Sequence, residues 1–363
     1  MVRVLHTEAS VGWGGQEIRI LQECIAMRDK GHQVLLVVER EAKLGQHARK
    51  HGFLVHEVSF SYSSSPKTIF KLVRLIIQEK IEIMNTHSSL DAWIAGIAAR
   101  LTRCKIVRTR HISAKIKPGL NSRALYHFLA DFTVTTCEEV AEVIRRQASL
   151  TTKRCRSIPT GIQPNQIKFT QDEVSNFKAK HNLKDEDFII GTACILRSWK
   201  GIEDLIHAAT LTKKENIKWV IVGNGPGFEY YQKQAMDKNL NDRVIFTDFL
   251  ENPYFAIASF DVFAMLSTAN EGVSQATLQG AFLEKPLITT PTGGLREICV
   301  DGLTGYSVPI NSPGAVAEKV QFFSENRHKA HEMGKAAREL VLSEFTFERT
   351  LHEVEKVYNS LTD

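Results

Sequence analysis

The chain has 363 residues, of which 43% are hydrophobic, 24% charged and 8% aromatic. This length and composition are typical of a folded protein with two or three domains, and they exclude a disordered chain, a collagen-like fibre and a disulfide-built miniprotein. The longest apolar run, Val34–Val38, is far shorter than the ~20 residues that span a bilayer. The six cysteines are scattered without a Cys-x-x-Cys pair, which favours reduced, buried thiols in a cytoplasmic protein over a disulfide framework or a zinc site.

The charge is unevenly distributed along the chain. The net charge of +5 divides into +11 for residues 1–165 and −6 for residues 166–363. A basic front half indicates either an ordinary solvated surface or an anionic partner, such as an acidic substrate or a membrane surface. Nucleic acid is not expected as a partner, because the basic residues are not interleaved with aromatic ones and no nucleic-acid-binding motif is present.

Short β-branched runs alternate with helical patterns in the front half. Strands are predicted at residues 2–6, 33–38, 53–58, 81–85, 105–109, 132–135 and 156–158, and helices at 16–28, 67–79 and 90–101. Such alternation is typical of βαβ units around a mostly parallel sheet. The polar, turn-rich residues 159–183 are predicted to form a connector.

A second alternation follows the connector. Strands are predicted at residues 188–194, 219–222, 244–246, 262–265 and 286–289, and helices at 202–211, 228–235, 313–323, 328–342 and 347–361. The sequence therefore predicts two doubly wound α/β domains in tandem. We expect ligands to bind at the carboxyl ends of the strands, in a cleft between the domains.

Three loops that follow predicted strands have ligand-binding character. Gly12–Gly15 opens the first helix, where glycines allow an anion to approach the backbone, although a plain tight turn is the alternative. Arg197 and Lys200 stand where a diphosphate could be held, although two basic residues in a loop are often only solvated. The segment Gly223–Gly227 is either a sharp turn or a nucleotide contact.

The strongest motif is the segment Asn270–Gly280. A helix that begins near Val273 would direct its free N–H groups and its dipole toward an anion. Glu271 precedes this helix, so its carboxylate could bind sugar hydroxyls beside a phosphate. Gln279 is expected on the same helix face as Ser274 and Gln275.

Taken together, these segments resemble the retaining family 4 glycosyltransferases of the two-domain GT-B type. The shared segments, which extend over nearly the whole chain, are the first glycine-rich loop, Asn85-Thr86-His87, 108–111, 158–162, the Arg197–Lys200 loop, Gly-Asn-Gly-Pro at 223–226, the Glu271 segment and 345–349. The resemblance implies an acceptor-binding Rossmann-like domain (1–165), a nucleotide-sugar-binding Rossmann-like domain (166–345) and a C-terminal helix (346–363) that crosses back onto the first domain.

The resemblance also implies a reaction. A hexose-type sugar would move from a UDP- or GDP-linked donor to a hydroxyl of a glycan or glycolipid acceptor, with retention of the anomeric configuration. No metal ion and no other cofactor is expected. The expected setting is the synthesis of lipopolysaccharide or another surface polysaccharide, in the cytoplasm or at the inner face of the cytoplasmic membrane, where an anionic membrane surface is a further expected partner.

Roles for individual residues follow from the same resemblance. Arg197 and Lys200 match the diphosphate clamp, Glu271 matches the residue that holds the donor sugar, and His111 matches a histidine at the reacting sugar. The other donor-side candidates are Gly14, Gly15, Gly225, Gly272, Val273, Ser274, Gln275 and Gln279. The acceptor-side candidates, chosen from a basic cluster in the first domain, are Arg110, Lys115 and Lys117.

The chain departs from the family pattern at three places. Gln279 replaces a glutamate that holds the ribose hydroxyls, and an amide lacks the stronger charge-assisted hydrogen bond. Asp248 stands where glycine is common, and Arg197 lies closer to Lys200 than is usual. These departures keep two alternatives open, namely a sugar-nucleotide epimerase or phosphorylase and a non-catalytic sugar-nucleotide-binding module on the same fold.

Two further patterns have competing interpretations. The basic amphipathic segment 67–77 is expected to cover a sheet, and a membrane-surface helix is the alternative. Asp185-Glu186-Asp187 spells the metal-binding motif of a different glycosyltransferase fold, but its place in a charged linker predicts a solvated turn.

Overall fold

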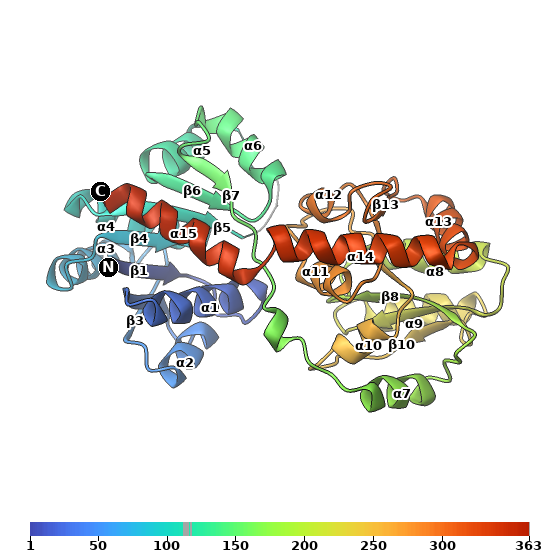
Figure 1. The fold of residues 1–363 in the computed structure, drawn as a ribbon. Helices are drawn as coiled ribbons and strands as arrows, with labels where there is room; N and C mark the ends of the chain where they lie inside the picture. The colour runs from blue at the N-terminus through green and yellow to red at the C-terminus, as the bar shows by residue number, and fades with distance from the viewer. Residues whose placement is uncertain (112–115, 117, 363) are drawn as a thin grey trace. The chain divides into compact units, whose positions relative to one another are not determined.

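The computed structural model describes residues 1–111, 116 and 118–362, and the chain divides into two compact units (Figure 1). Unit 1 comprises Met1–Pro159 and Arg349–Asp363, and unit 2 comprises Thr160–Glu348. The sequence-based division assigns residues 160–165 to the first domain, whereas in the structure they cluster with unit 2. There Ile162 forms a parallel bridge with Thr346, and its carbonyl accepts a hydrogen bond of 2.8 Å from the N–H of Phe347.

In the described part of unit 1, parallel strands form one sheet in the order β3-β2-β1-β4-β5-β6-β7. The strands are β1 (Arg3–Glu8), β2 (Gln33–Glu39), β3 (Val55–Val58), β4 (Ile83–Thr86), β5 (Lys105–Arg110), β6 (Phe132–Thr135) and β7 (Cys155–Ser157). Most of their side chains are buried on both faces, as expected for a parallel sheet covered by helices. The strand order reverses between β1 and β4, and such a switch point is where doubly wound sheets bind ligands.

Helices connect these strands and cover the sheet. They are α1 (Gly15–Asp29), α2 (Lys43–Lys50), α3 (Ser65–Gln78), α4 (Ser89–Thr102), α5 (Leu120–Arg123), α6 (Glu138–Ala148) and α15 (Phe347–Thr362). The C-terminal α15 belongs to unit 1 from Arg349 onward, so the predicted return of the chain to the first domain is confirmed. Its Tyr358 is fully buried, donates a hydrogen bond of 3.1 Å to Glu23 and accepts one of 2.9 Å from Asn85.

Unit 2 has the same architecture, with parallel strands in the order β10-β9-β8-β11-β12-β13. The strands are β8 (Phe188–Ala193), β9 (Ile217–Val222), β10 (Val244–Phe246), β11 (Val262–Met265), β12 (Leu287–Thr289) and β13 (Gly305–Ser307). The helices are α7 (Gln171–Lys180), α8 (Ile202–Leu211), α9 (Phe228–Asp237), α10 (Tyr254–Ala258), α11 (Gln275–Phe282), α12 (Leu295–Ile298), α13 (Pro313–Glu325) and α14 (Arg327–Glu344). A hydrophobic core that includes Trp219, Ile190 and Phe323 lies between the sheet and helices such as α8 and α13.

The structure corrects the sequence analysis at the connector. Residues 159–183 are not wholly irregular, because they contain α7. Thr170 caps this helix by accepting from the N–H of Glu173 (3.2 Å), and the Glu173 carboxylate accepts from the N–H of Thr170 (2.7 Å). This reciprocal cap stabilises a polar helix that has little apolar periodicity to reveal it.

The structure also shows the state of the cysteines and the apolar character of the helices. All six cysteines are free thiols, and five of them are buried. Among the described residues, no helix is both long and apolar enough to cross a membrane.

Candidate functional site

The centre of the candidate site in unit 2 is a buried ion pair between Lys200 and Glu271. Lys200 Nζ lies 2.6 Å from Glu271 Oε2, and the Ser267 hydroxyl donates a hydrogen bond of 2.6 Å to the same oxygen. The Lys200 and Glu271 side chains are only 16% and 8% exposed, so their attraction is weakly screened by solvent. The other carboxylate oxygen, Oε1, accepts no hydrogen bond from the described residues and is available to a ligand hydroxyl.

Two glycines allow the loops around this pair to approach each other. Gly201 has φ +68°, and a Cβ at this position would meet the carbonyl group of Leu266. Gly293 has φ +54°, and a Cβ there would collide with the carbonyl oxygen of Glu271. Because left-handed backbone favours glycine and no space remains for a side chain, both residues are required by the backbone path that brings Lys200 to Glu271.

The helix α11 begins next to the ion pair and presents backbone donors. Ser274 caps it by accepting from the N–H of Thr277 at 3.3 Å. The N–H groups of Gly272, Val273 and Gln275 find no acceptor among the described residues. These groups lie at the positive end of the helix dipole, an arrangement that suits an anion.

The two glutamines of α11 lie one turn apart. The Gln275 side chain donates a hydrogen bond of 2.6 Å to the carbonyl oxygen of Thr160, so its amide already has a partner. Gln279 is half-buried.

The structure brings Lys200, Glu271 and the start of α11 together, as the sequence predicts.

The Arg197 loop and the glycine-rich turn after β9 pack against each other. Arg197 is exposed, with its guanidinium 5.2 Å from the centre of the Trp199 ring. The N–H of Gly227 donates to the carbonyl of Leu196 at 2.9 Å. Gly225 has φ +154°, and a Cβ would press on the Leu196 backbone. Packing between the two loops thus accounts for Gly225 without a ligand.

In unit 1, the first glycine-rich loop precedes α1. The N–H of Gly14 donates to the Glu17 carboxylate at 2.8 Å, which closes the first turn of the helix. A Cβ on Gly15 would meet no atom within 4 Å, so packing does not explain a glycine there. Trp13 stacks on His47 of α2 with ring centres 3.9 Å apart. The backbone at Gly15 is therefore open to a ligand.

His111 belongs to a row of three histidines at the carboxyl ends of neighbouring strands. His6 Nδ1 lies 2.9 Å from His87 Nε2, and His87 Nδ1 lies 2.8 Å from His111 Nε2. Burial lowers the pKa of His6 from 6.5 to about 3, and burial together with nearby cationic groups lowers the pKa values of His87 and His111 well below 6.5. All three rings are therefore neutral at pH 7.

Two buried carboxylates hold the backbone beside these histidines. Asp91 accepts hydrogen bonds from the N–H groups of His87 (2.9 Å) and Ser88 (2.8 Å) and from the Thr7 hydroxyl (2.8 Å). Glu8 accepts from the Ser88 hydroxyl. Burial raises the pKa of both acids, that of Asp91 to about 7. The network fastens the end of β1 to the start of α4.

The acceptor-side candidates are only partly described. Arg110 donates a hydrogen bond of 3.0 Å to the Tyr126 hydroxyl. Lys115 and Lys117 lie outside the described residues. In the same basic cluster, Arg108 is buried and donates to the carbonyl of Ser88 at 2.9 Å.

Two family models match the chain in succession. The model described as Glycosyltransferase Family 4 matches residues 13–166, and the model described as Glycosyl transferases group 1 matches residues 173–340. The chain belongs to the family 4 glycosyltransferases. This identity makes it a transferase enzyme, as the sequence analysis expects.

Known proteins resemble this glycosyltransferase over most of its length. CapM of Staphylococcus aureus, named a capsular polysaccharide biosynthesis glycosyltransferase, is 24% identical over 315 residues, which are 82% of this chain and 81% of CapM. The N-acetyl-alpha-D-glucosaminyl L-malate synthase of Bacillus anthracis is 22% identical over 348 residues, 92% of this chain and 90% of that protein. HepE of Anabaena, solved in complex with UDP, has a TM-score of 0.88 at 18% identity and is matched over 99% of this chain and 100% of its own. The predicted GT-B fold is confirmed.

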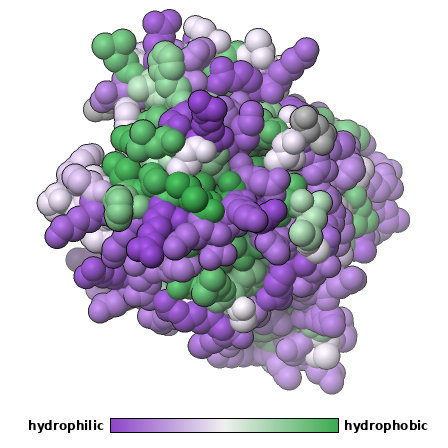
Figure 2. Space-filling view, turned by 90° about the vertical axis from the view of Figure 1, so that its left-hand side faces the viewer, coloured by the Kyte–Doolittle hydropathy of each residue, from purple (hydrophilic) through white to green (hydrophobic). Residues whose placement is uncertain are grey.

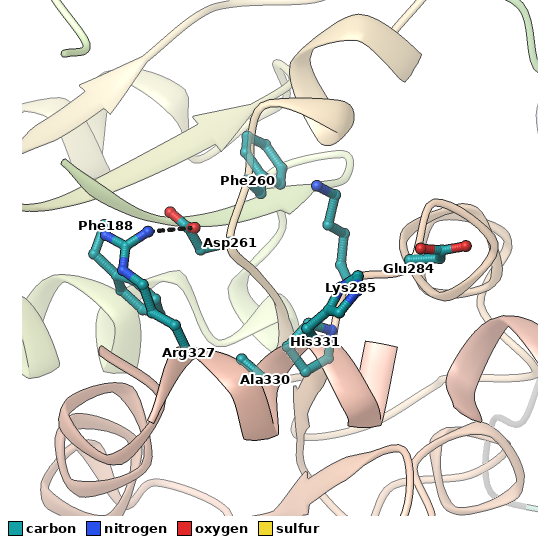
Figure 3. Close-up of a pocket in the computed structure, with 9 residues that line it drawn as sticks. Phe188, Phe260, Asp261, Glu284, Lys285, Arg327, Ala330 and His331 are labelled. Carbon is teal, nitrogen blue, oxygen red and sulfur yellow. Dashed lines mark hydrogen bonds and ion pairs between the residues drawn. The ribbon is translucent and has the colours of Figure 1, made fainter. Parts of the chain in front are cut away.

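Unit 2 also contains a pocket of about 160 Å³, whose lining includes Phe188, Asp261 and Arg327 (Figure 3). Its residues Phe188 and Pro286 stand at the amino ends of β8 and β12, whereas Lys200 and Glu271 follow the carboxyl ends of strands. Two of its charged residues pair with each other, since Arg327 contacts Asp261 at 3.3 Å. The pocket is therefore no part of the candidate site.

The segment Asp185-Glu186-Asp187, predicted to be a solvated turn, is solvated only in part. Asp185 is exposed and pairs with Lys178 at 3.2 Å, whereas Asp187 is buried and accepts from the N–H of Lys184 at 2.8 Å. Within residues 1–111, 116 and 118–362, no group of three or more His, Cys, Asp or Glu side chains could hold a metal ion.

Sequence reasoning assigned no role to several residues of these networks. They are Ser267, which supports Glu271, and Glu8, Asp91, His6 and His87 in unit 1. His6 and His87 had one usable signal, since each stands at or just after the end of a predicted strand. Their contact depends on β1 and β4 being neighbours, which the chain order does not reveal.

Proposed function

We propose that this glycosyltransferase moves a hexose-type sugar from a UDP- or GDP-linked donor to a hydroxyl of a glycan or glycolipid, with retention of configuration. The observation that carries the proposal is the Lys200–Glu271 pair beside the unpaired N–H groups that precede and open α11. As the glycosidic bond breaks, negative charge grows on the leaving diphosphate. Lys200, Arg197 and the backbone donors stabilise that charge, while Glu271 Oε1 accepts from a sugar hydroxyl.

In the proposed reaction, Lys200 is shared between two partners. Without donor, its charge is balanced by Glu271 at 2.6 Å. A diphosphate bound at the start of α11 competes for the ammonium group, which leaves Glu271 more basic toward a hydroxyl donor. The leaving phosphate can take the proton of the acceptor hydroxyl, so the scheme needs no separate protein base.

Two relatives support the class of acceptor and the nucleotide of the donor that we propose. CapM is named for capsular polysaccharide biosynthesis, and HepE was solved with UDP. We therefore place the acceptor among surface polysaccharides and their lipid-linked precursors, and we favour UDP as the nucleotide of the donor. His111, Gly14 and Gly15 in unit 1 are proposed to contact the donor sugar, and Arg110, Lys115 and Lys117 to contact an anionic acceptor.

The proposed chemistry predicts donor turnover without a divalent metal. Incubation with a panel of UDP- and GDP-sugars should release the nucleoside diphosphate from one of them, and the rate should be unchanged by excess EDTA because protein cations and N–H groups neutralise the leaving group. NMR of the product should show the anomeric configuration of the donor. Loss of activity in EDTA would contradict the metal-free scheme, an epimerised nucleotide sugar would support the epimerase alternative, and tight binding without turnover would support a binding module.

The proposed membrane-borne acceptor has a matching surface on α3. The outward side of this helix carries the exposed residues Lys67, Phe70, Lys71, Arg74 and Ile77, and Phe70 is 70% exposed. The helix contains no acidic residue. The opposite side of α3 packs with α4 into the core through Leu72 and Ile76, so the fold does not need the outer apolar residues. Figure 2, which looks onto the left-hand side of Figure 1, shows apolar residues gathered among hydrophilic ones on that face.

Charge reversal on α3 should weaken binding to anionic vesicles. Each basic residue near such a surface contributes about 1 kcal/mol, so the double variant Lys71→Glu/Arg74→Glu should reduce the partition coefficient at least about 30-fold. Sedimentation with vesicles of anionic or neutral lipid, across a salt series, measures the effect. The matched control is Lys233→Glu/Lys238→Glu, at exposed positions of unit 2 with the same change in net charge. Equal losses in both variants would contradict a surface on α3.

A further inference from the structure

The three histidines of unit 1 form a continuous hydrogen-bonded row across three neighbouring strands. His6 lies in β1, His87 directly follows β4 and His111 directly follows β5, and these strands are adjacent in the order β1-β4-β5. The His6 and His87 rings are stacked with centres 5.2 Å apart, and the His87 and His111 rings are 5.0 Å apart. The row runs from the buried interior of the sheet to the half-buried His111.

Burial, together with the charged groups around the row, keeps the three rings neutral. Arg19 of α1 and Arg108 of β5 both disfavour a proton on His87 and His111. The carboxylates on this side, Glu8 of β1 and Asp91 of α4, are engaged by hydroxyl and backbone N–H donors rather than by an imidazole ring. Each ring in the row therefore carries one proton, on one of its two nitrogens.

Two hydrogen bonds between three neutral rings allow only two arrangements. In the first, every ring is protonated at Nδ1, so that His6 donates to His87 and His87 donates to His111. In the second, every ring is protonated at Nε2 and the bonds run in the opposite direction. The choice made at one end of the row therefore fixes the tautomer at the other end.

The buried end of the row distinguishes the two arrangements. His6 Nε2 is buried and has no hydrogen-bond partner. In the first arrangement this atom is a bare acceptor, whereas in the second it is a bare N–H donor. An orphaned buried N–H group is rare in proteins, which favours the first arrangement.

We propose that His6 and His87 are positioning residues that hold His111 in its Nδ1-protonated form. Nδ1 of His111 has no partner within the described part of the chain, so its N–H is free to donate to an oxygen of the donor sugar or of the acceptor. In this form the ring cannot accept a proton at Nδ1, and it acts as a hydrogen-bond donor and not as a base. The identity of the recipient oxygen rests on the proposed function, whereas the tautomer does not.

The first test is spectroscopic and needs no substrate. Long-range ¹H–¹⁵N correlation spectra of the full chain with ¹⁵N-labelled histidine distinguish Nδ1–H from Nε2–H rings, and the single variants His6→Asn, His87→Asn and His111→Asn identify these three rings among the 13 histidines. We expect His6, His87 and His111 all to be Nδ1–H at pH 7.5. An Nε2–H signal for His111, or an imidazolium, would overturn the proposal whether or not the protein transfers sugar.

Variants at His6 test whether this residue determines the tautomer of His111, two hydrogen bonds away. His6→Asn retains an N–H donor near the position of Nδ1, so His111 should remain Nδ1–H and most of the turnover should persist. His6→Leu removes the donor, so His111 should become a mixture of tautomers and kcat should fall about 3- to 10-fold, the effect of one neutral hydrogen bond, while KM for the donor changes less. An unchanged His111 signal in folded His6→Leu would overturn the proposal. A correct tautomer without transfer of any sugar would leave it standing and contradict the proposed function instead.

Discussion

Lys200→Ala is expected to lower the free energy of unfolding of unit 2 by about 3–5 kcal/mol and to reduce sugar transfer by at least about 10- to 100-fold. The first effect arises because Glu271, 8% exposed, would be left as a buried charge with Ser267 as its remaining donor. The second arises because one charge-assisted contact to the leaving diphosphate is lost, worth about 1.5–3 kcal/mol. Chemical denaturation and steady-state kinetics measure the two effects separately.

A double-mutant cycle with Glu271→Gln separates the contribution of the ion pair to stability from the contribution of Lys200 to donor binding. The coupling energy between Lys200 and Glu271 should be large in unfolding experiments and smaller in donor binding, where Lys200 acts on phosphate. The matched control is Lys214→Ala in the exposed pair Lys214–Glu325 of the same unit, whose N–O distance is 3.0 Å and whose side chains are nearly half exposed. Lys214→Ala should lower the free energy of unfolding by less than about 1 kcal/mol. Equal costs at Lys200 and Lys214 would contradict the role assigned to the buried pair.

The second large effect is a loss of stability of unit 1 in mild acid. The pKa of His6 is lowered from 6.5 to about 3 by burial, so between these values the unfolded chain binds a proton that the folded chain excludes. The stability that neutral His6 provides is complete above pH 6.5 and declines as the pH falls, by about 1.4 kcal/mol per pH unit. His87 and His111 act in the same direction.

Comparison of the wild type with His6→Asn isolates this effect. This comparison is needed because two buried acids have the opposite effect on stability. The pKa of Asp91 is raised to about 7 and that of Glu8 is also raised, so both acids bind protons more tightly in the folded chain and stabilise it as the pH falls. The His6→Asn variant should be less stable than the wild type at pH 7.5, and the difference should shrink by about 1.4 kcal/mol per pH unit below pH 6.5. Urea unfolding at pH 7.5, 6.0 and 5.0 measures it, with the exposed His328→Asn as control. A constant difference across this range would contradict a neutral, buried His6.

The strands were predictable from the sequence because most of them are β-branched runs buried on both faces. Those at 132–135, 244–246 and 262–265 match the observed bounds, and the helix at 202–211 does as well. β13 escaped prediction because Gly305–Ser307 is short and half-polar. The helices α2, α6 and α7 escaped prediction because their exposed faces are strongly polar, and α2 also begins without a capping side chain or an acidic residue in its first turn.

The candidate site was predictable in part for a different reason. Lys200 and Glu271 each follow a strand of one sheet, and the carboxyl ends of parallel strands meet at one edge, so their proximity follows from the predicted topology. Gly225, by contrast, is explained by packing against Leu196. The row of histidines depends on which strands are neighbours and on side-chain burial, neither of which a single sequence displays.

The division of the chain has a consequence for its synthesis. Unit 2 is one uninterrupted segment, whereas unit 1 is assembled from both ends of the chain. Tyr358, which forms buried hydrogen bonds with Glu23 and Asn85, follows unit 2 in the sequence and therefore leaves the ribosome after it. More than 150 residues of unit 1 are synthesised before unit 2. The residues of α15 that complete the core of unit 1 are synthesised after unit 2, so part of that core stays exposed to solvent during synthesis.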